Sequence, residues 1–190
     1  ISTFPALNID IDSYPAIKEH LLKFGRERLE QSGKKGSRKK SSNRWFETQD
    51  NIRYWQEFEK PKIMYQRFQT KPCFMYDEQG LYCNDSMWII SKPDKFLLGM
   101  LNSKMGWWLI SKYCTAIQNG YQLIWQYFRQ ILIPIISQEQ QQPIIALVDQ
   151  ILTAKKSNPK ADTSELEKEI DKIVYELYGL SEEEIRIIEG

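Results

Sequence analysis

The strongest constraint on the fold lies near the C-terminus, where two segments carry regular apolar stripes. The first has apolar residues at spacings of four and three: Ile144, Val148 and Ile151. This spacing predicts a helix that begins at Pro143, since proline is well suited to the first turn of a helix. The helix is expected to end before Asn158-Pro159, because proline disfavours helical geometry in the residue that precedes it.

A second helix is predicted from the region of Ser164, where Ser164 and Glu167 form the pattern of a capping box. Its stripe has heptad spacing: Leu166, Ile170, Ile173 and Leu177. Gly179 is placed to end this helix, and Ser181 with Glu184 repeats the capping pattern before a short last helix. The two stripes predict an antiparallel helical hairpin that buries a shared seam. Ordinary core helices and a coiled coil that docks on a partner both fit this pattern.

Residues 1–136 mix helical and strand patterns and are expected to form a separate globular domain. Helices are predicted at 15–31 and 95–112. Strands are predicted in segments rich in aromatic and β-branched residues: 62–68, 72–76, 81–91 and 121–128. The apolar run 131–136 has Pro134 within it and favours an edge strand or a docking segment. The predicted fold class is therefore α+β: a mixed or antiparallel sheet with flanking helices, followed by the helical hairpin and terminal helix of residues 143–190.

Charge is strongly segregated along a chain whose net charge is only +1. Residues 23–44 hold nine basic and two acidic residues, a net charge of +7, whereas residues 162–190 hold three basic and ten acidic residues, a net charge of −7. A concentrated positive segment predicts a surface that attracts a polyanion, and a merely solvated loop is the alternative explanation. Gly33, Gly36 and Ser37 interrupt the charges, which suits a backbone that approaches phosphates closely.

The candidate site residues fall into two groups. Phosphate contacts are predicted for six cations of the basic segment: Lys34, Lys35, Arg38, Lys39, Lys40 and Arg44. Trp45, which follows them, is also a predicted nucleic-acid contact. Reading of base edges is predicted for polar side chains near two turns: Gln66, Arg67, Gln69, Lys71, Gln118, Asn119 and Gln122. For Gln66 or Arg67 alone, simple alternation in and out of a sheet is the competing interpretation.

Catalytic and metal-binding motifs are absent from the sequence. No acidic residue is followed two positions later by lysine, as a common nuclease core requires, and no Gly-x-Gly or P-loop occurs. His20 is the only histidine, and the three cysteines form no C-x-x-C pair. We therefore expect no catalytic residue, no metal site and no disulfide, and we expect a reducing, cytoplasmic location. No apolar stretch reaches the length of about 18 residues that a membrane-spanning helix needs.

With these elements in order, the chain resembles the C-terminal specificity domain of TaqI-like, type IIG restriction-modification enzymes. The matching segments, in chain order, are 14–31, 36–49, 59–68, 74–85, 97–110, 131–135 and 176–189. The chain is also similar in plan to type I specificity subunits, which join a globular reader to a helical spacer. Its helical pair is shorter, which leaves open whether the pair spans between recognition domains or docks on a methyltransferase, in cis or in trans.

The resemblance implies a double-stranded DNA recognition module without catalytic activity of its own. In such enzymes the same polypeptide carries a nuclease and an adenine methyltransferase domain, whose cofactors are Mg and S-adenosylmethionine. Because the chain begins with Ile1, we expect it to be a piece of such a polypeptide. Two other functions remain open: a protein-interaction adaptor that uses its aromatic surface and acidic helices, and an autonomous methyltransferase or nuclease.

Overall fold

The computed structural model describes residues 1–190 and divides into two compact units, Ile1–Gln56 and Glu57–Gly190. Eight α-helices and two antiparallel three-stranded sheets make this an α+β fold, as the sequence predicts. The boundary between the units lies near residue 57, whereas the sequence patterns place a boundary between residues 136 and 143. None of the helices is both long and apolar enough to cross a membrane.

The N-terminal unit is built on short helices and irregular chain around a small core. Its helical elements are η1 (Pro5–Leu7), η2 (Ile11–Ser13), α1 (Pro15–Leu22) and α2 (Arg26–Leu29). Its core consists of Ile11, Leu29, Trp45 and Phe46. The single helix predicted at 15–31 is wrong, because Gly25 has a φ of 87° and the chain turns there between α1 and α2.

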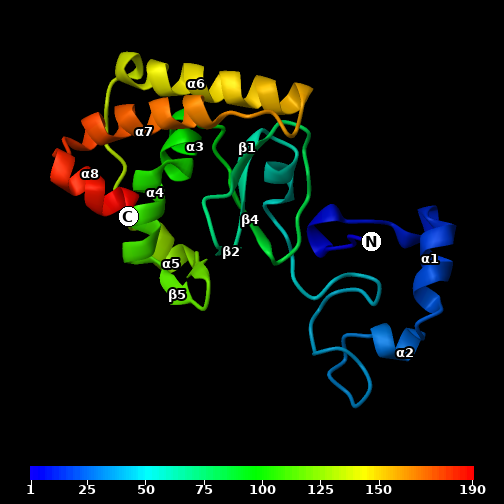
Figure 1. Ribbon diagram of the computed structural model, residues 1–190. Coiled ribbons are helices and arrows are strands. Elements are labelled where there is room, and N and C mark those ends of the chain that lie inside the picture. Colours follow the sequence, from blue (N-terminus) through cyan, green and yellow to red (C-terminus); the bar gives the residue numbers. More distant parts are fainter. The chain divides into compact units, whose positions relative to one another are not determined.

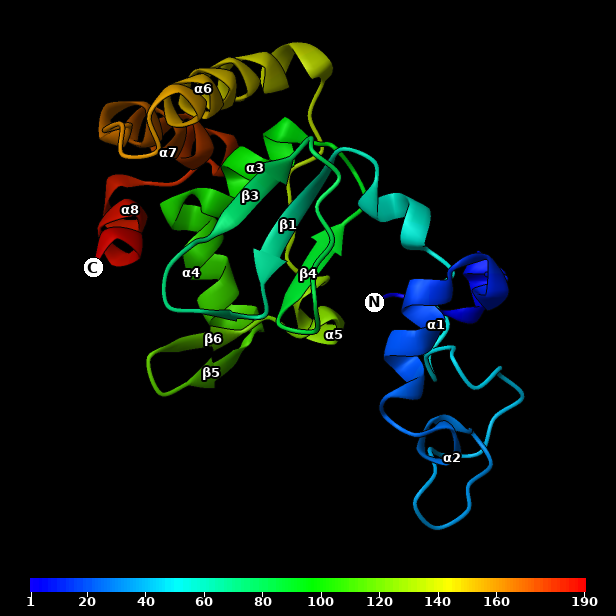
Figure 2. The same cartoon turned by 90° about the vertical axis from the view of Figure 1, so that its right-hand side faces the viewer.

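The main sheet of the second unit has the strand order β3-β1-β4, with both pairings antiparallel. Its strands are β1 (Lys62–Gln66), β3 (Phe74–Asp77) and β4 (Met87–Ile90), and η3 (Trp55–Phe58) precedes them. Ile63 and Tyr65 lie on the face that packs into the hydrophobic core. Figure 2 shows the three strands side by side, with α3 and α4 along one face.

A second, smaller sheet pairs two distant parts of the sequence. It has the order β2-β6-β5 and consists of β2 (Phe68–Gln69), β5 (Thr115–Ile117) and β6 (Gly120–Gln122). Gly120 has a φ of 157°, and a Cβ there would lie 2.0 Å from the carbonyl oxygen of Gln69, so only glycine lets β6 approach β2 this closely. The strand predicted at 121–128 is short, since β6 ends at Gln122 and α5 (Trp125–Phe128) follows.

The helix predicted at 95–112 is interrupted and forms α3 (Lys95–Asn102) and α4 (Lys104–Tyr113). Ser103 separates them: its hydroxyl donates to the carbonyl of Met100 at 2.7 Å and accepts from the amide of Gly106 at 3.0 Å. Ser103 is thus both the end of α3 and the N-cap of α4. Asn102 ties the end of α3 to the sheet through two hydrogen bonds with the backbone of Phe74.

The C-terminal helices are α6 (Gln138–Ser157), α7 (Ser164–Tyr178) and α8 (Glu182–Glu189). Figure 1 shows α6 and α7 running side by side as a hairpin next to α3. Gly179 ends α7 with a left-handed φ of 65°, as predicted, and the predicted capping box of Ser181 and Glu184 is present.

One predicted helix start and one predicted cap in the hairpin need correction. The first helix begins before Pro143, because Ser137 and Gln140 form a capping box that starts α6 at Gln138. The second helix begins at Ser164, as predicted, but its N-cap is Thr163. The Thr163 hydroxyl donates to the carboxylate of Glu167 at 2.6 Å.

The predicted seam of the hairpin is only partly buried, and it packs against α3 as well as between α6 and α7. Ile144, Val148 and Ile170 are buried, as is Val174, which the heptad pattern leaves out. The remaining predicted seam residues are half-buried: Ile151, Leu166, Ile173 and Leu177. A Cβ on Gly99 of α3 would lie 2.6 Å from Ile144 Cγ2, so α3 packs directly against α6. The hairpin therefore shares one core with the sheet and α3.

The apolar run 131–136 is an extended segment without regular hydrogen-bonded structure. Ile131, Ile133 and Ile136 pack against the core, whereas Leu132 and Ile135 point into solvent, with exposures of 70% and 102%. The Tyr178 hydroxyl donates to the carbonyl of Leu132 at 2.7 Å and ties the run to α7. The segment is therefore no edge strand.

Candidate nucleic-acid interface

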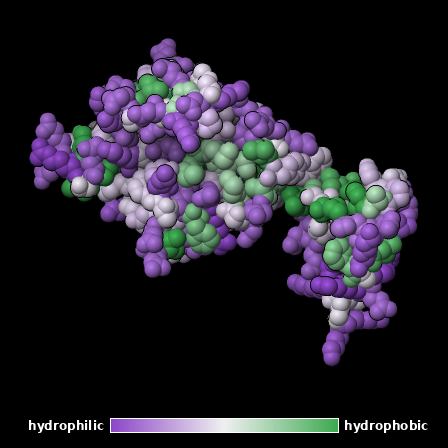
Figure 3. All heavy atoms as spheres, turned by 45° about the vertical axis from the view of Figure 1, so that its right-hand side comes forward, coloured by the Kyte–Doolittle hydropathy of each residue, from purple (hydrophilic) through white to green (hydrophobic).

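The basic segment forms a closed loop, which we call the basic loop (residues 31–44). The backbone amide of Arg38 donates to the carbonyl of Glu30, and that of Gly33 to the carbonyl of Arg38, both at 3.0 Å. A third backbone bond joins Ser41 to Gln31 at 3.0 Å. Figure 3 shows hydrophilic side chains gathered at one end of the N-terminal unit and hydrophobic ones at its other end.

Two buried polar side chains hold the basic loop on its unit. Gln31 is 4% exposed, donates to the carbonyl of Glu47 at 2.7 Å and accepts from the hydroxyl of Ser41 at 2.6 Å. Glu47 is also 4% exposed, and its carboxylate accepts from Arg44 Nε at 2.7 Å. Buried polar groups satisfied in this way fix a local conformation, so the loop is a preformed surface.

Four predicted phosphate contacts lie on this loop with their charges uncompensated: Lys34, Lys35, Lys39 and Lys40. All four residues are exposed, and none belongs to the ion pairs of the chain. Clustered lysines without carboxylate partners create a positive field that favours a bound polyanion.

The two predicted arginines of the loop also have internal partners. Arg38 Nη1 donates to the carbonyl of Glu47 at 2.8 Å, and the remaining guanidinium N–H groups are available for a ligand. Arg44 pairs with Glu47 at 2.6 Å and lies 4.8 Å from the ring centre of Phe46. Trp45 is only 8% exposed and belongs to the core, with Arg26 stacked over its ring at 4.4 Å. A buried indole cannot reach DNA, so Trp45 is removed from the candidate interface.

Two of the predicted base-reading residues, Arg67 and Gln122, meet where β2 and β6 pair. The backbone amide of Leu123 donates to the carbonyl of Arg67 at 2.8 Å, which places Gln122 beside Arg67. With its amide oxygen facing the guanidinium, Gln122 accepts from Arg67 Nη2 at 3.0 Å and Nε at 3.1 Å. The ring centres of Phe68 and Trp88 lie 5.4 Å and 5.7 Å from the guanidinium carbon.

This arrangement, the Arg67–Gln122 pair, holds a guanidinium fork in a fixed orientation. The side chain of Arg67 is 29% exposed, and its Nη1 lies 3.8 Å from the exposed carboxylate of Asp85. A guanidinium held on one edge is suited to bidentate recognition of guanine through its other edge, where the exposed carboxylate of Asp85 is the competing group. Phe68 and Trp88 could not be assigned to the site from the sequence. Aromatic residues in a predicted strand indicate core packing and give no separate signal for a binding site.

The other predicted base readers separate into exposed and buried residues. Gln66, Lys71, Gln118 and Asn119 are exposed, the last two in the turn between β5 and β6. Gln69 is 1% exposed, donates to the carbonyl of Gln66 at 3.1 Å and accepts from the amide of Cys73 at 3.0 Å. Because these bonds occupy its amide inside the turn, Gln69 is a structural residue and leaves the candidate interface.

The side chains offer no clustered metal ligands. No group of three or more His, Cys, Asp or Glu residues is arranged to hold a metal ion. The three cysteines are free thiols, and burial raises the pKa of Cys114 to about 11. A thiol with a raised pKa is a weak nucleophile, so Cys114 is a core residue.

The chain thus carries a preformed cationic loop in its N-terminal unit and an arginine held by a glutamine in its second unit, features that suit recognition of nucleic acid. Residues 10–143 match the TaqI-like C-terminal specificity domain, and the chain belongs to this family of restriction-modification specificity domains. A specificity domain of this kind binds DNA. The match ends inside α6, so most of the helical hairpin lies beyond the matched residues.

Proposed function

We propose that this chain is the double-stranded DNA recognition module of a type IIG restriction-modification enzyme. Its parent polypeptide would carry a nuclease and an adenine methyltransferase domain. The observation that carries this proposal is the basic loop, where four exposed lysines without carboxylate partners lie on a conformation fixed by Gln31 and Glu47. Family membership supports the restriction-modification context.

The two units supply different parts of recognition. Lys34, Lys35, Lys39 and Lys40 bind phosphates, which gives affinity and register but no sequence discrimination. The Arg67–Gln122 pair and the exposed amides of the β5–β6 turn read base edges, because forked donors and acceptors distinguish base pairs in the major groove. Affinity and specificity are therefore separable by mutation.

Chemistry belongs to the rest of the proposed parent enzyme. This chain contributes no catalytic residue, and S-adenosylmethionine and Mg would be bound by the methyltransferase and nuclease domains. The methyltransferase domain of the same polypeptide is the proposed partner of the helical hairpin. Free thiols and a DNA substrate support a cytoplasmic location.

The test is a salt titration of DNA binding by the purified chain. A DNA reader should bind duplex DNA with an affinity that falls steeply as salt rises, since each phosphate contact contributes about 0.9 to the logarithmic slope. A flat salt dependence, or no binding, would instead favour the protein-interaction adaptor. Methylation or cleavage by the isolated chain, with S-adenosylmethionine or magnesium, would contradict the non-catalytic assignment.

A further inference from the structure

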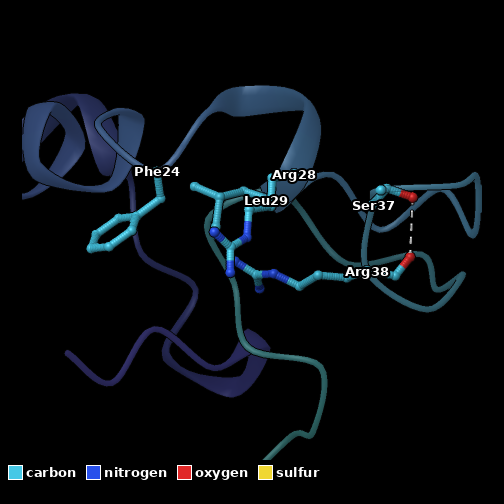
Figure 4. Close-up of a pocket in the computed structure, with 6 residues that line it drawn as sticks. Phe24, Arg28, Leu29, Ser37 and Arg38 are labelled. Carbon is cyan, nitrogen blue, oxygen red and sulfur yellow. Dashed lines mark hydrogen bonds between the residues drawn. The ribbon is translucent and has the colours of Figure 1, made fainter.

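An open pocket of about 380 Å³ lies between α2 and the basic loop in the N-terminal unit. Its lining residues are Phe24, Arg28, Leu29, Gly36, Ser37 and Arg38. Figure 4 shows Arg28 entering from the helix and Arg38 from the loop, with their guanidinium groups close together in this view. The pocket thus brings together two cations that are ten positions apart in the sequence.

The charge in this pocket is not neutralised by the protein. Arg28 is exposed and belongs to none of the ion pairs of the chain. The one hydrogen bond of the Arg38 guanidinium goes to a neutral carbonyl, that of Glu47. Two guanidinium groups in one pocket repel each other unless an anion lies between them. Their planar forks fit the tetrahedral oxygens of a phosphate group.

The remaining walls suit the sugar that is attached to a phosphate. Phe24 is 52% exposed beside the two arginines, and its ring packs edge-on against His20 at 5.3 Å. Gly36 faces open space, since a Cβ there would meet no atom within 4 Å. The Ser37 hydroxyl already donates to the carbonyl of Lys34 at 2.8 Å, so it stabilises the loop. One wall is therefore apolar and another is bare backbone.

We propose that this pocket binds one backbone phosphodiester of the DNA, with the adjoining deoxyribose against Phe24. The assignment rests on the proposed DNA-binding function and adds Arg28 and Phe24 to the interface. A polymeric phosphate is favoured over a free one because the pocket is open and the four lysines of the same loop extend the positive surface beyond it. The contact positions the protein and reads no base.

The test compares Arg28→Ala with Arg53→Ala, which removes an exposed charge from the same unit outside the pocket. Duplex binding is measured across a salt series. Arg28→Ala should reduce the salt slope by about 0.9 and weaken binding on the order of tenfold, and more than Arg53→Ala does. Arg28→Lys should keep the slope and still lose affinity, since the ammonium retains the charge but not the fork.

A second arm uses duplexes that carry one neutral methylphosphonate at each backbone position in turn. At one backbone position, the methylphosphonate should weaken DNA binding by the wild-type chain. The same substitution should not weaken binding by Arg28→Ala, because that variant has already lost the contact. Inorganic phosphate alone should show no saturable binding that depends on Arg28. If inorganic phosphate binds saturably in an Arg28-dependent way, while Arg28→Ala keeps the salt slope of the wild-type chain, the pocket binds free phosphate and the assignment to DNA is wrong. If the wild-type chain binds DNA with a steep salt dependence and Arg28→Ala behaves like the wild-type chain in both arms, the pocket assignment alone is overturned. A wild-type chain that binds no DNA overturns the proposed function as well.

Discussion

Lys62 and Asp77 lie opposite each other on β1 and β3 and form an ion pair that solvent does not reach. Lys62 Nζ also donates to the carbonyl of Phe58 at 2.5 Å. The Asp77 carboxylate further accepts from the amides of Gln79 at 3.0 Å and Leu81 at 2.9 Å. The pair therefore joins the start of β1, the end of β3 and the turn that follows β3.

Replacing Lys62 by Met should destabilise the fold by about 3–5 kcal/mol, because it leaves the Asp77 carboxylate buried without its partner. Chemical denaturation measures the loss. Lys168→Met, which breaks the exposed pair with Glu165, is the control and should change stability by less than about 1 kcal/mol. Equal effects of the two substitutions would contradict a structural role for the buried pair.

The same pair predicts how stability responds to acid. Burial raises the pKa of Asp77, but the hydrogen bonds from Lys62, Gln79 and Leu81 outweigh it and hold the pKa below its ordinary value. A lowered pKa in the folded state means that this contribution to stability is present above the ordinary pKa and lost as the pH falls through the lowered one. Lys62→Met should therefore show a weaker loss of stability on acidification than the wild-type chain.

Asp171 should respond to pH in the opposite direction. Burial raises the pKa of its carboxyl, although the carboxyl also accepts from the amide of Lys104 at 2.8 Å. A raised pKa in the folded state gives a contribution that is full at acid pH and lost as the pH rises through the raised value. Asp171→Asn keeps an acceptor without the charge, so its unfolding free energy should fall less as the pH rises.

Replacing Lys39 and Lys40 by Ala should weaken binding to all DNA sequences alike. The salt slope should fall by about one unit for each lost phosphate contact. Lys156→Ala with Lys160→Ala is the matched control, because both lysines are exposed and belong to no ion pair of the chain. A slope that the loop variant leaves unchanged would place these two lysines outside the interface.

Replacing Arg67 by Ala should relax the preference at one base pair, at a cost of about 1–3 kcal/mol. Binding to all single-base variants of the preferred site measures this. Gln122→Ala should affect the same base pair less, and the double variant should cost less than the sum, since Gln122 acts by orienting Arg67. A uniform loss across all sequences would make Arg67 a phosphate contact.

Ile170→Asp should destabilise the second unit by several kcal/mol, because a charge would enter a position that is 5% exposed. Circular dichroism and thermal melting measure the loss. Lys172→Asp, on the exposed side of the same helix, should cost less than about 1 kcal/mol. An unchanged melting temperature for Ile170→Asp would remove Ile170 from the core.

Local signals in the sequence predict the end of α7 and the start of α8 well, but they miss the start of α6 and the break between α3 and α4. Gly179 and the box of Ser181 and Glu184 depend on neighbouring residues alone, so their pattern is sufficient. The break at Ser103 depends on the buried setting of its hydroxyl, because the apolar period continues through it from α3 into α4. Pro143 predicts a helix start, but the capping box of Ser137 and Gln140 starts α6 earlier, at Gln138.

The sequence predicts those site residues whose role follows from side-chain type and local context alone. Exposed lysines of a Gly/Ser loop are recognisable from the sequence, whereas tertiary packing buries Gln69 and Trp45. Pairing of Arg67 with Gln122 depends on β2 meeting β6 across more than fifty residues, which no local pattern specifies. Arg28 belongs to the pocket because the loop folds back against α2.

The close approach of α3 to α6 at Gly99 has a consequence for engineering new specificities. A recombinant reader that stops where the family match stops, at residue 143, would leave Gly99 and the apolar face around it uncovered. Such a truncated protein should aggregate or fail to express, because Ile144, Val148, Ile170 and Val174 complete its core. A recombinant recognition domain should therefore extend through α7. On the proposed function, new specificities are better introduced by exchanging the β5–β6 turn than by exchanging the whole region before the helices.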